Sequence, residues 1–287
     1  MIFPNNLVII LLMVLLPVSG NKKENPLDIL RNDPPFVAYL KLTSHANDEF
    51  KGQENYRLQA LATVDSYVGK YKEAKECFAR FDSITNQNRG ILIAVLDTGQ
   101  VLNPDSTILW QAKQHQIVAF NEEHHVPMDR AIVYHYLPML AKLGYKYLAV
   151  EALNNLDSTI LKRGYPVNKL TGVYTNEPIN GNLIRYAISL GYHLIAYDYG
   201  WDDALGKREE IQAQHIVEKY HPGKGKLVIL AGYGHICESP SVRMMGSFLE
   251  KDLNEDLLTI KLTRSGDYPS RLDTSFVKPV VIPFRVK

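Results

Sequence analysis

The sequence predicts an α/β protein in which a mostly parallel β-sheet carries helices on both faces and follows a small helical region. First, 46% of the 287 residues are hydrophobic and 22% are charged, which is typical of a globular protein. Second, from about residue 90 onward, short β-rich apolar runs alternate with segments long enough for crossover helices. Third, residues 21–89 show instead the three- and four-residue apolar spacing of helices.

Charge and cysteine content exclude several classes of protein. With 32 basic and 31 acidic residues, the net charge is +1, so there is no basic excess to neutralise phosphates and no nucleic-acid partner is expected. The cysteines Cys77 and Cys237 are too few for a disulfide-stapled scaffold or a Cys-rich zinc module.

The N-terminus is typical of an export signal. Leu7 to Leu16 is a continuous apolar run, and the small residues Val18 and Gly20 follow it. We expect a signal peptide over residues 1–20, a mature chain that starts near Asn21, and a periplasmic or secreted protein. The run is shorter than the roughly 20 apolar residues that a span needs, so no stable membrane span is expected after cleavage. An uncleaved anchor is the alternative.

The region 21–89 predicts a helical hairpin that turns at Gly69. Its apolar side chains recur at helical spacing: Leu58, Leu61, Ala62, Tyr67, Tyr71, Ala74 and Phe78. The spacing from Gly69 to Phe78 is similar to a single tetratricopeptide-type unit, and a plain amphipathic helix pair is the alternative interpretation. Because one such unit cannot bury a continuous core, we expect it to pack on the neighbouring domain.

The region 90–287 predicts the α/β domain. Its candidate strands are residues 91–96, 116–120, 147–150, 193–197, 226–230 and 257–262. A helix is expected over Arg208 to Tyr220. Pro138 interrupts the helix after the 116–120 strand, and it should kink that helix or start a new segment there.

Titratable side chains follow four consecutive candidate strands. These residues are Glu122, His124 and His125 after 116–120, Glu151 after 147–150, Asp198 after 193–197, and His235 after 226–230. Ligands of open α/β sheets bind outside the carboxyl ends of the strands. We therefore predict one shared site in which Glu122, His124, Glu151 and His235 are catalytic. The glycines Gly232 and Gly234 allow the sharp turn that would present His235.

Further side chains are predicted to bind a substrate or a developing oxyanion. Arg208 and Gln212 lie one helical turn apart and share a face, so Arg208 can hold a carboxylate or a substrate anion. Arg130 is placed similarly in the helix after His125. Thr175 and Glu177 lie in a segment that we expect to flank the site. No Gly-x-Ser-x-Gly, His-Glu-x-x-His or phosphate-loop motif is found in the sequence.

Together these motifs resemble the erythromycin esterase/ChaN/Tiki superfamily over roughly residues 116–245. The resemblance is carried by Glu122-x-His124-His125 with Arg130, the strand-end Glu151, Arg208-Glu209-x-x-Gln212-Ala213, and Gly232-x-Gly234-His235. Asn121 replaces the glycine that usually precedes the first of these motifs. The resemblance implies the site and not the substrate, because members include esterases with a histidine base and no required metal, metal-dependent proteases, and haem-binding proteins of iron uptake.

Three functional hypotheses follow. In the first, the chain hydrolyses an ester or amide bond in a small molecule or peptide: His124 or His235 activates water, while Arg130 or Arg208 stabilises the oxyanion. Zinc or manganese is a candidate cofactor, with Glu122, His125, Glu151 and His235 as candidate ligands. In the second, the chain binds haem or a metal for iron uptake, with His124, His125 or His235 as axial ligand. In the third, it is an inactive adaptor that binds a protein partner through its N-terminal helices.

Overall fold

The computed structural model describes residues 24–44, 50–85, 102–199, 206–232 and 234–262. The N-terminal helices are α1 (Pro26–Asn32), α2 (Pro35–Ser44), α3 (Glu54–Tyr67) and α4 (Tyr71–Thr85). The hairpin predicted around Gly69 is confirmed, since α3 and α4 pack together across this residue. Gly69 has a φ of +82°, a left-handed conformation that glycine adopts without steric cost.

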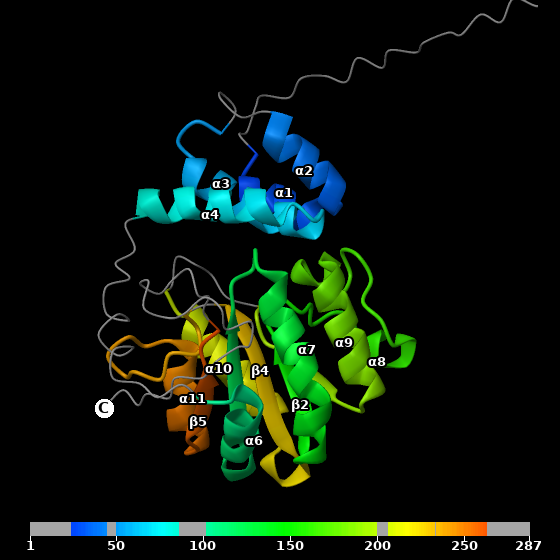
Figure 1. The fold of residues 1–287 in the computed structure, drawn as a ribbon, viewed down its shortest axis with the longest axis vertical. Coiled ribbons are helices and arrows are strands. Elements are labelled where there is room, and N and C mark those ends of the chain that lie inside the picture. Colours follow the sequence, from blue (N-terminus) through cyan, green and yellow to red (C-terminus); the bar gives the residue numbers. More distant parts are fainter. Residues whose placement is uncertain (1–23, 45–49, 86–101, 200–205, 233, 263–287) are drawn as a thin grey trace, which may run out of the picture.

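The following region forms the predicted α/β sheet (Figure 1). Its strands are β1 (Ile117–Glu122), β2 (Tyr145–Val150), β3 (His193–Ala196), β4 (Lys226–Gly232) and β5 (Leu257–Ile260). All their pairings are parallel, in the order β3-β2-β4-β1-β5. These strands confirm the sequence-based expectations to within a few residues, and the candidate strand 91–96 lies outside the described residues.

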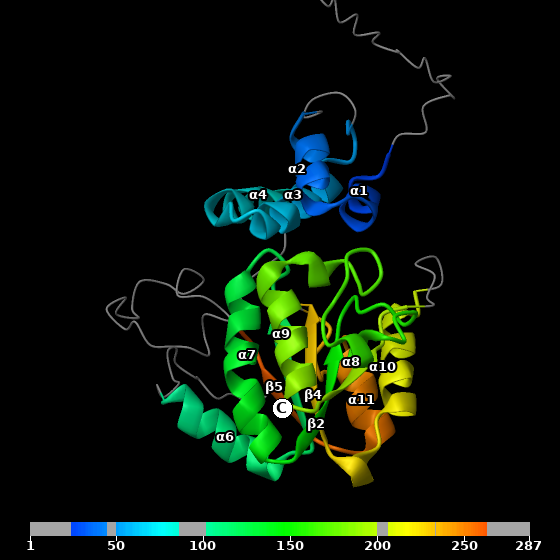
Figure 2. The ribbon, with the colours of Figure 1, turned by 90° about the vertical axis from the view of Figure 1, so that its right-hand side faces the viewer.

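Helices cover both faces of the sheet, as predicted (Figure 2). The helices are α6 (Pro104–Gln114), α7 (Pro127–Lys142), α8 (Ile160–Arg163), α9 (Pro178–Ser189), α10 (Arg208–Lys219) and α11 (Met245–Leu253). Val118 and Phe120 of β1 pack in one core with α6, α7 and α9, whereas Ile117 and Ala119 pack in the other with α10 and α11. Because successive strand residues face opposite sides, burial of both faces explains the continuous apolar runs.

Of the two outcomes expected at Pro138, a kink or a new segment, the structure excludes the new segment, because α7 runs through Pro138 as one helix. Proline has no backbone N–H, so the helix lacks the hydrogen bond that residue 138 would donate to the carbonyl of Tyr134. Tyr134 is an exposed residue, and the neighbouring Leu137 and Leu140 are fully buried in the core. Burial of this apolar face therefore outweighs the loss of one hydrogen bond. None of the described helices has the length and hydropathy that crossing a bilayer requires.

The N-terminal helices lie over the carboxyl ends of the strands (Figures 1 and 2). Their core, which includes Leu42 and Tyr67, takes in Val173 and Tyr174 of the α/β domain. The Tyr67 hydroxyl donates to the Val173 carbonyl at 3.3 Å, and the ring of Phe78 in α4 stacks on His125 with centroids 3.9 Å apart. The helical region therefore packs on the α/β domain, as expected for a hairpin that cannot bury a continuous core alone.

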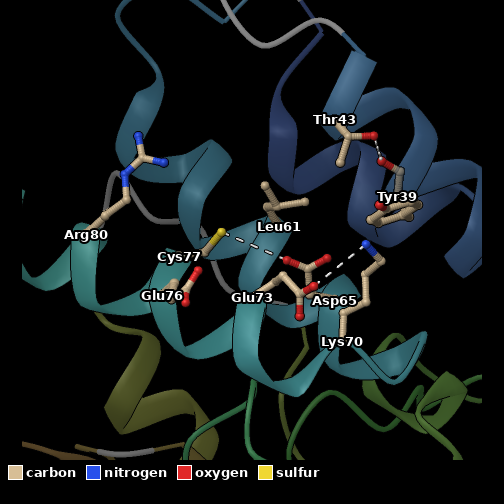
Figure 3. A pocket seen from close by; sticks show the side chains of 9 residues that line it. All are labelled: Tyr39, Thr43, Leu61, Asp65, Lys70, Glu73, Glu76, Cys77 and Arg80. Carbon is tan, nitrogen blue, oxygen red and sulfur yellow. Dashed lines mark hydrogen bonds and ion pairs between the residues drawn. The ribbon is translucent and has the colours of Figure 1, made fainter.

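A hollow of about 260 Å³ opens between α2, α3 and α4, away from the strand ends (Figure 3). Asp65 lines it, is only 3% exposed, and has the Cys77 thiol as a weak hydrogen-bond partner at 3.9 Å. Burial raises the pKa of Asp65 to about 6, although Lys70 opposes the shift. The ionised carboxylate is therefore disfavoured in the folded protein.

Asp65→Asn is expected to remove a pH-dependent cost of folding. The folded pKa is raised, so stability falls as the pH rises between the unfolded value near 4 and the folded value, and the loss is complete above pH 6. The free energy of unfolding of the variant, minus that of the parent, should grow by about 2–3 kcal/mol between pH 4 and pH 7 in urea titrations. Glu76→Gln, at an exposed residue of the same hollow, should show no such trend.

Candidate active site

Side chains from four strand ends converge at one edge of the sheet. Glu122 ends β1, Glu151 follows β2, and Asp198 and His235 follow β3 and β4. The Nε2 atoms of His124 and His235 lie 3.8 and 3.4 Å from the same oxygen of Glu151. These strands are neighbours in a parallel sheet, so their carboxyl ends meet. The structure thus brings together Glu122, His124, Glu151 and His235, the four predicted catalytic residues.

Glu122 is held by a buried guanidinium. Arg130, in the first turns of α7, donates from Nε and Nη2 to the two carboxylate oxygens of Glu122 at 2.6 and 2.8 Å. Burial disfavours the ionised carboxylate, but Arg130 and a hydrogen bond from His124 outweigh it and lower the pKa of Glu122 to about 2. Arg130 itself is 0% exposed, so it supports Glu122 instead of meeting an oxyanion, which corrects the predicted role.

Two other predicted substrate-binding residues are also structural. The carboxylate of Glu177 caps α9 by accepting from the backbone N–H groups of Ile179 and Asn180, and it lies 3.3 Å from Arg130. The Thr175 hydroxyl donates to the Gly172 carbonyl at 2.7 Å. Both side chains are buried, so they shape the segment that flanks the site and do not present groups to a substrate.

His124 is fixed from two sides. Its Nδ1 atom lies 2.8 Å from Glu122, and its ring stacks on Tyr174 with centroids 4.0 Å apart. Because a carboxylate only accepts, a neutral His124 carries its proton on Nδ1 and its lone pair on Nε2. The side chain is 19% exposed, so solvent reaches it. Tyr174 was missed in the sequence, where only its position beside Thr175 pointed to it.

Glu151 lies at the centre of the site and contacts several of its side chains. One oxygen accepts the backbone N–H of Gly232, and the other lies 3.1 Å from Nη2 of Arg208 and 3.4 Å from His235. Burial disfavours its charge, but His124, His235 and Arg208 outweigh burial and hold the pKa of Glu151 well below its usual range. It is therefore a permanent anion at the centre of the cluster.

Arg208, in the first turn of α10, is the most open of the cations around Glu151. Its side chain is 31% exposed and also lies 3.1 Å from Asp198, so its predicted substrate-binding role stays a prediction that this exposure allows. Gln212, one turn further along α10, is fully buried and donates to Asp198 at 2.7 Å. Gln212 therefore positions Asp198 and does not reach a substrate, which corrects its predicted role.

His235 is enclosed by two carboxylates. Its Nδ1 lies 2.8 Å from Glu209, a residue for which the sequence predicted no role, and its Nε2 lies 3.4 Å from Glu151. Burial favours the neutral ring, but the two carboxylates outweigh burial and raise the pKa of His235 to about 10. His235 is therefore an imidazolium at neutral pH, suited to donating a proton, and the alternative of His235 as general base is not supported.

The predicted metal set is not assembled. His125 stacks on Phe78 and lies 3.5 Å from Glu123. Both oxygens of Glu122 are occupied by Arg130. Within the described part of the chain, no three His, Cys, Asp or Glu side chains are grouped as a metal site would require. Two of the four predicted ligands, His125 and Glu122, are thus engaged by Phe78 and Arg130.

Asn121, which directly precedes Glu122, lies in regular strand geometry. It pairs with Ala231 within β1 and β4 and is not among the described residues with positive φ. Its side-chain oxygen accepts the backbone N–H of Leu262, beyond β5. The asparagine therefore ties the chain after β5 to the strand that carries Glu122.

Gly232→Ala is expected to lower the rate of any reaction catalysed at this site by about 100-fold, since displacements near 1 Å cost this much. A Cβ atom there would lie 2.7 Å from Glu151 Oε2 and 3.1 Å from His124 Nε2, so both side chains must shift. Gly234→Ala is the matched control, because its Cβ would meet only the flexible end of Met244 at 3.3 Å. Comparing kcat/KM of the two variants checks this, and equal losses would contradict it.

Comparisons with known proteins do not identify a family. No family model and no curated protein matches the chain. A solved structure, RRSP, a MARTX toxin effector domain from Vibrio vulnificus CMCP6, aligns with a TM-score of 0.39 and 15% identity over 74% of this chain and 50% of that chain. The chain thus spans about half the length of that structure. A similarity this low supports no statement about function, and the superfamily resemblance stays a prediction.

Proposed function

We propose that the protein is an exported hydrolase in which His124 activates water against an ester or amide bond. One observation carries the proposal: the Nε2 atom of His124 lies 3.8 Å from Glu151, while its Nδ1 is held by Glu122 at 2.8 Å. A water at a hydrogen-bond distance of about 2.8 Å from both Nε2 and the Glu151 oxygen fits this spacing. Such a water would donate one proton to each acceptor.

The chemical step follows from these positions. The water oxygen bonds to the carbonyl carbon as His124 Nε2 takes its proton, and the carbonyl π electrons move onto the oxygen. Arg208, the cation that solvent reaches, lies 3.1 Å from Glu151 and would stabilise this oxyanion. When the oxyanion collapses, the bond to the alkoxide or amine breaks, and protonated His235 or His124 supplies the leaving group's proton.

The fixed surroundings support catalysis. Glu122 and Tyr174 hold the His124 ring, Arg130 holds Glu122, and Glu177 holds Arg130. Each group is oriented before a substrate arrives, which reduces the reorganisation needed in the transition state. The resemblance to a superfamily that includes histidine-dependent esterases also favours this function.

A panel of esters and peptides, incubated with the chain from Asn21 in the presence and absence of a chelator, tests the proposal. We expect turnover of at least one bond class, lost in His235→Ala and kept in His135→Ala, at an exposed histidine of α7. Activity that survives the chelator supports water activation by His124 alone. Wild-type inactivity on the whole panel, or equal rates in both variants, would count against a hydrolase.

The same protein can be titrated with haem to examine the iron-uptake hypothesis. His124, His125 and His235 already contact Tyr174, Phe78 and Glu209 respectively, so an axial ligand would have to break one of these contacts. A Soret band that disappears on substitution of one histidine would favour haem binding over hydrolysis. A pull-down that requires the N-terminal helices and leaves the panel unhydrolysed would favour the adaptor.

A further inference from the structure

The loop between Glu151 and Tyr174, residues 153–172, buries the carboxylate of Asp157 and leaves five large apolar side chains exposed. At its base, Leu153 and Gly172 form an antiparallel bridge, and the N–H of Asn154 donates to the Thr171 carbonyl at 2.6 Å. Gly172 is required there, since a Cβ would lie 2.0 Å from the Ala152 carbonyl oxygen. The two ends of the loop are therefore joined by backbone contacts, and the loop contains α8.

The interior of the loop is an ion-paired network. The carboxylate of Asp157 accepts from Nη1 and Nη2 of Arg163 at 3.1 and 2.6 Å and from the Thr171 hydroxyl at 2.6 Å. Asp157 and Thr171 are buried. This network holds the loop in place together with Leu153 and Ile160, which are buried in the core of the α/β domain.

The other large apolar side chains of the loop are exposed. Leu156, Leu161, Tyr165, Val167 and Leu170 are between 36% and 80% exposed. The loop thus exposes five large apolar residues within fifteen positions, and exposed apolar surface concentrated on a folded protein marks where it contacts an apolar phase or partner. The loop and α8 lie at the outer side of the α/β domain (Figure 1).

The charged residues of the loop indicate which kind of surface its exposed apolar side chains contact. Asp157 is the one acidic residue of the loop and is neutralised by Arg163, whereas Lys162 and Lys169 are exposed. The outer surface thus combines apolar side chains with positive charge. Lysine is depleted from protein interfaces but is favoured beside anionic lipid, where apolar side chains enter the headgroup boundary.

We propose that the 153–172 loop docks the protein on an anionic lipid surface. The loop starts two residues after Glu151 and ends two residues before Tyr174, so docking would bring the edge that carries His124 close to the bilayer. The proposal is independent of the chemistry at that edge, because lipid binding is measured without any substrate.

Co-sedimentation with vesicles tests it, using the chain from Asn21, which keeps every residue that the structure describes. We expect binding to vesicles of equal parts phosphatidylglycerol and phosphatidylcholine, and little binding to phosphatidylcholine alone. Lys162→Glu with Lys169→Glu should weaken binding about 30-fold or more. Leu156→Ser with Leu161→Ser should weaken it without lowering the thermal unfolding temperature, because both side chains are exposed.

The matched control is Trp110→Ser with Lys113→Glu, a similarly exposed apolar and basic pair on α6. It should bind vesicles as the parent does. Absence of binding to the anionic vesicles, or an equal loss in the control, would overturn the proposal. So would a parent dimer in gel filtration that the leucine substitutions convert to a monomer, because a second copy of the chain would then cover the loop.

Discussion

Replacing Arg130 by methionine is expected to lower the free energy of unfolding by about 3–5 kcal/mol. The guanidinium is completely buried, binds both oxygens of Glu122, and lies 3.3 Å from Glu177. Methionine has a similar length but no charge, so it would leave two buried carboxylates without their shared cation. Removal of one partner from a buried ion pair costs far more than the pair contributes relative to apolar residues.

Urea unfolding at pH 7 measures this effect. Arg185→Met on α9 is the matched control, because Arg185 is exposed and its loss should change stability by less than about 0.5 kcal/mol. The double variant Arg130→Met with Glu122→Gln should recover part of the loss, since one stranded charge is then neutral. A loss below about 1 kcal/mol for Arg130→Met would mean that the carboxylates find other partners.

His124→Gln is expected to lower kcat/KM of the proposed hydrolysis by a factor of about 10²–10⁴. Glutamine can keep the hydrogen bond to Glu122, but it has no group that accepts a proton from water at neutral pH. The neighbours that hold the ring, Glu122 and Tyr174, are unchanged in this variant. The expected loss is therefore one of chemistry and not of folding.

The measurement is a steady-state assay on the best substrate of the panel, together with the thermal unfolding temperature. His135→Gln is the control, because His135 is exposed on α7 and its Nε2 lies 3.4 Å from Asp105, outside the site. Its kcat/KM should equal that of the parent. If His124→Gln keeps activity within a factor of about ten, another group activates the water.

The sequence by itself determined the sheet and the convergence of its polar strand ends. Successive strand residues face two apolar cores, so buried parallel strands appear in the sequence as continuous apolar runs. The polar residue that follows each run can be identified directly from the sequence. Glu122, Glu151 and His235 could therefore be placed at one edge, because neighbouring parallel strands end on the same side.

Only the tertiary structure decided what each polar residue does there. His124 and His125 are adjacent in sequence, yet one ring stacks on Tyr174 in the site and the other on Phe78 beneath the N-terminal hairpin. Arg130 and Gln212 have the residue types of substrate-binding groups, but both are buried against carboxylates of the framework. Such roles depend on burial and on partners from distant segments, which local spacing does not encode.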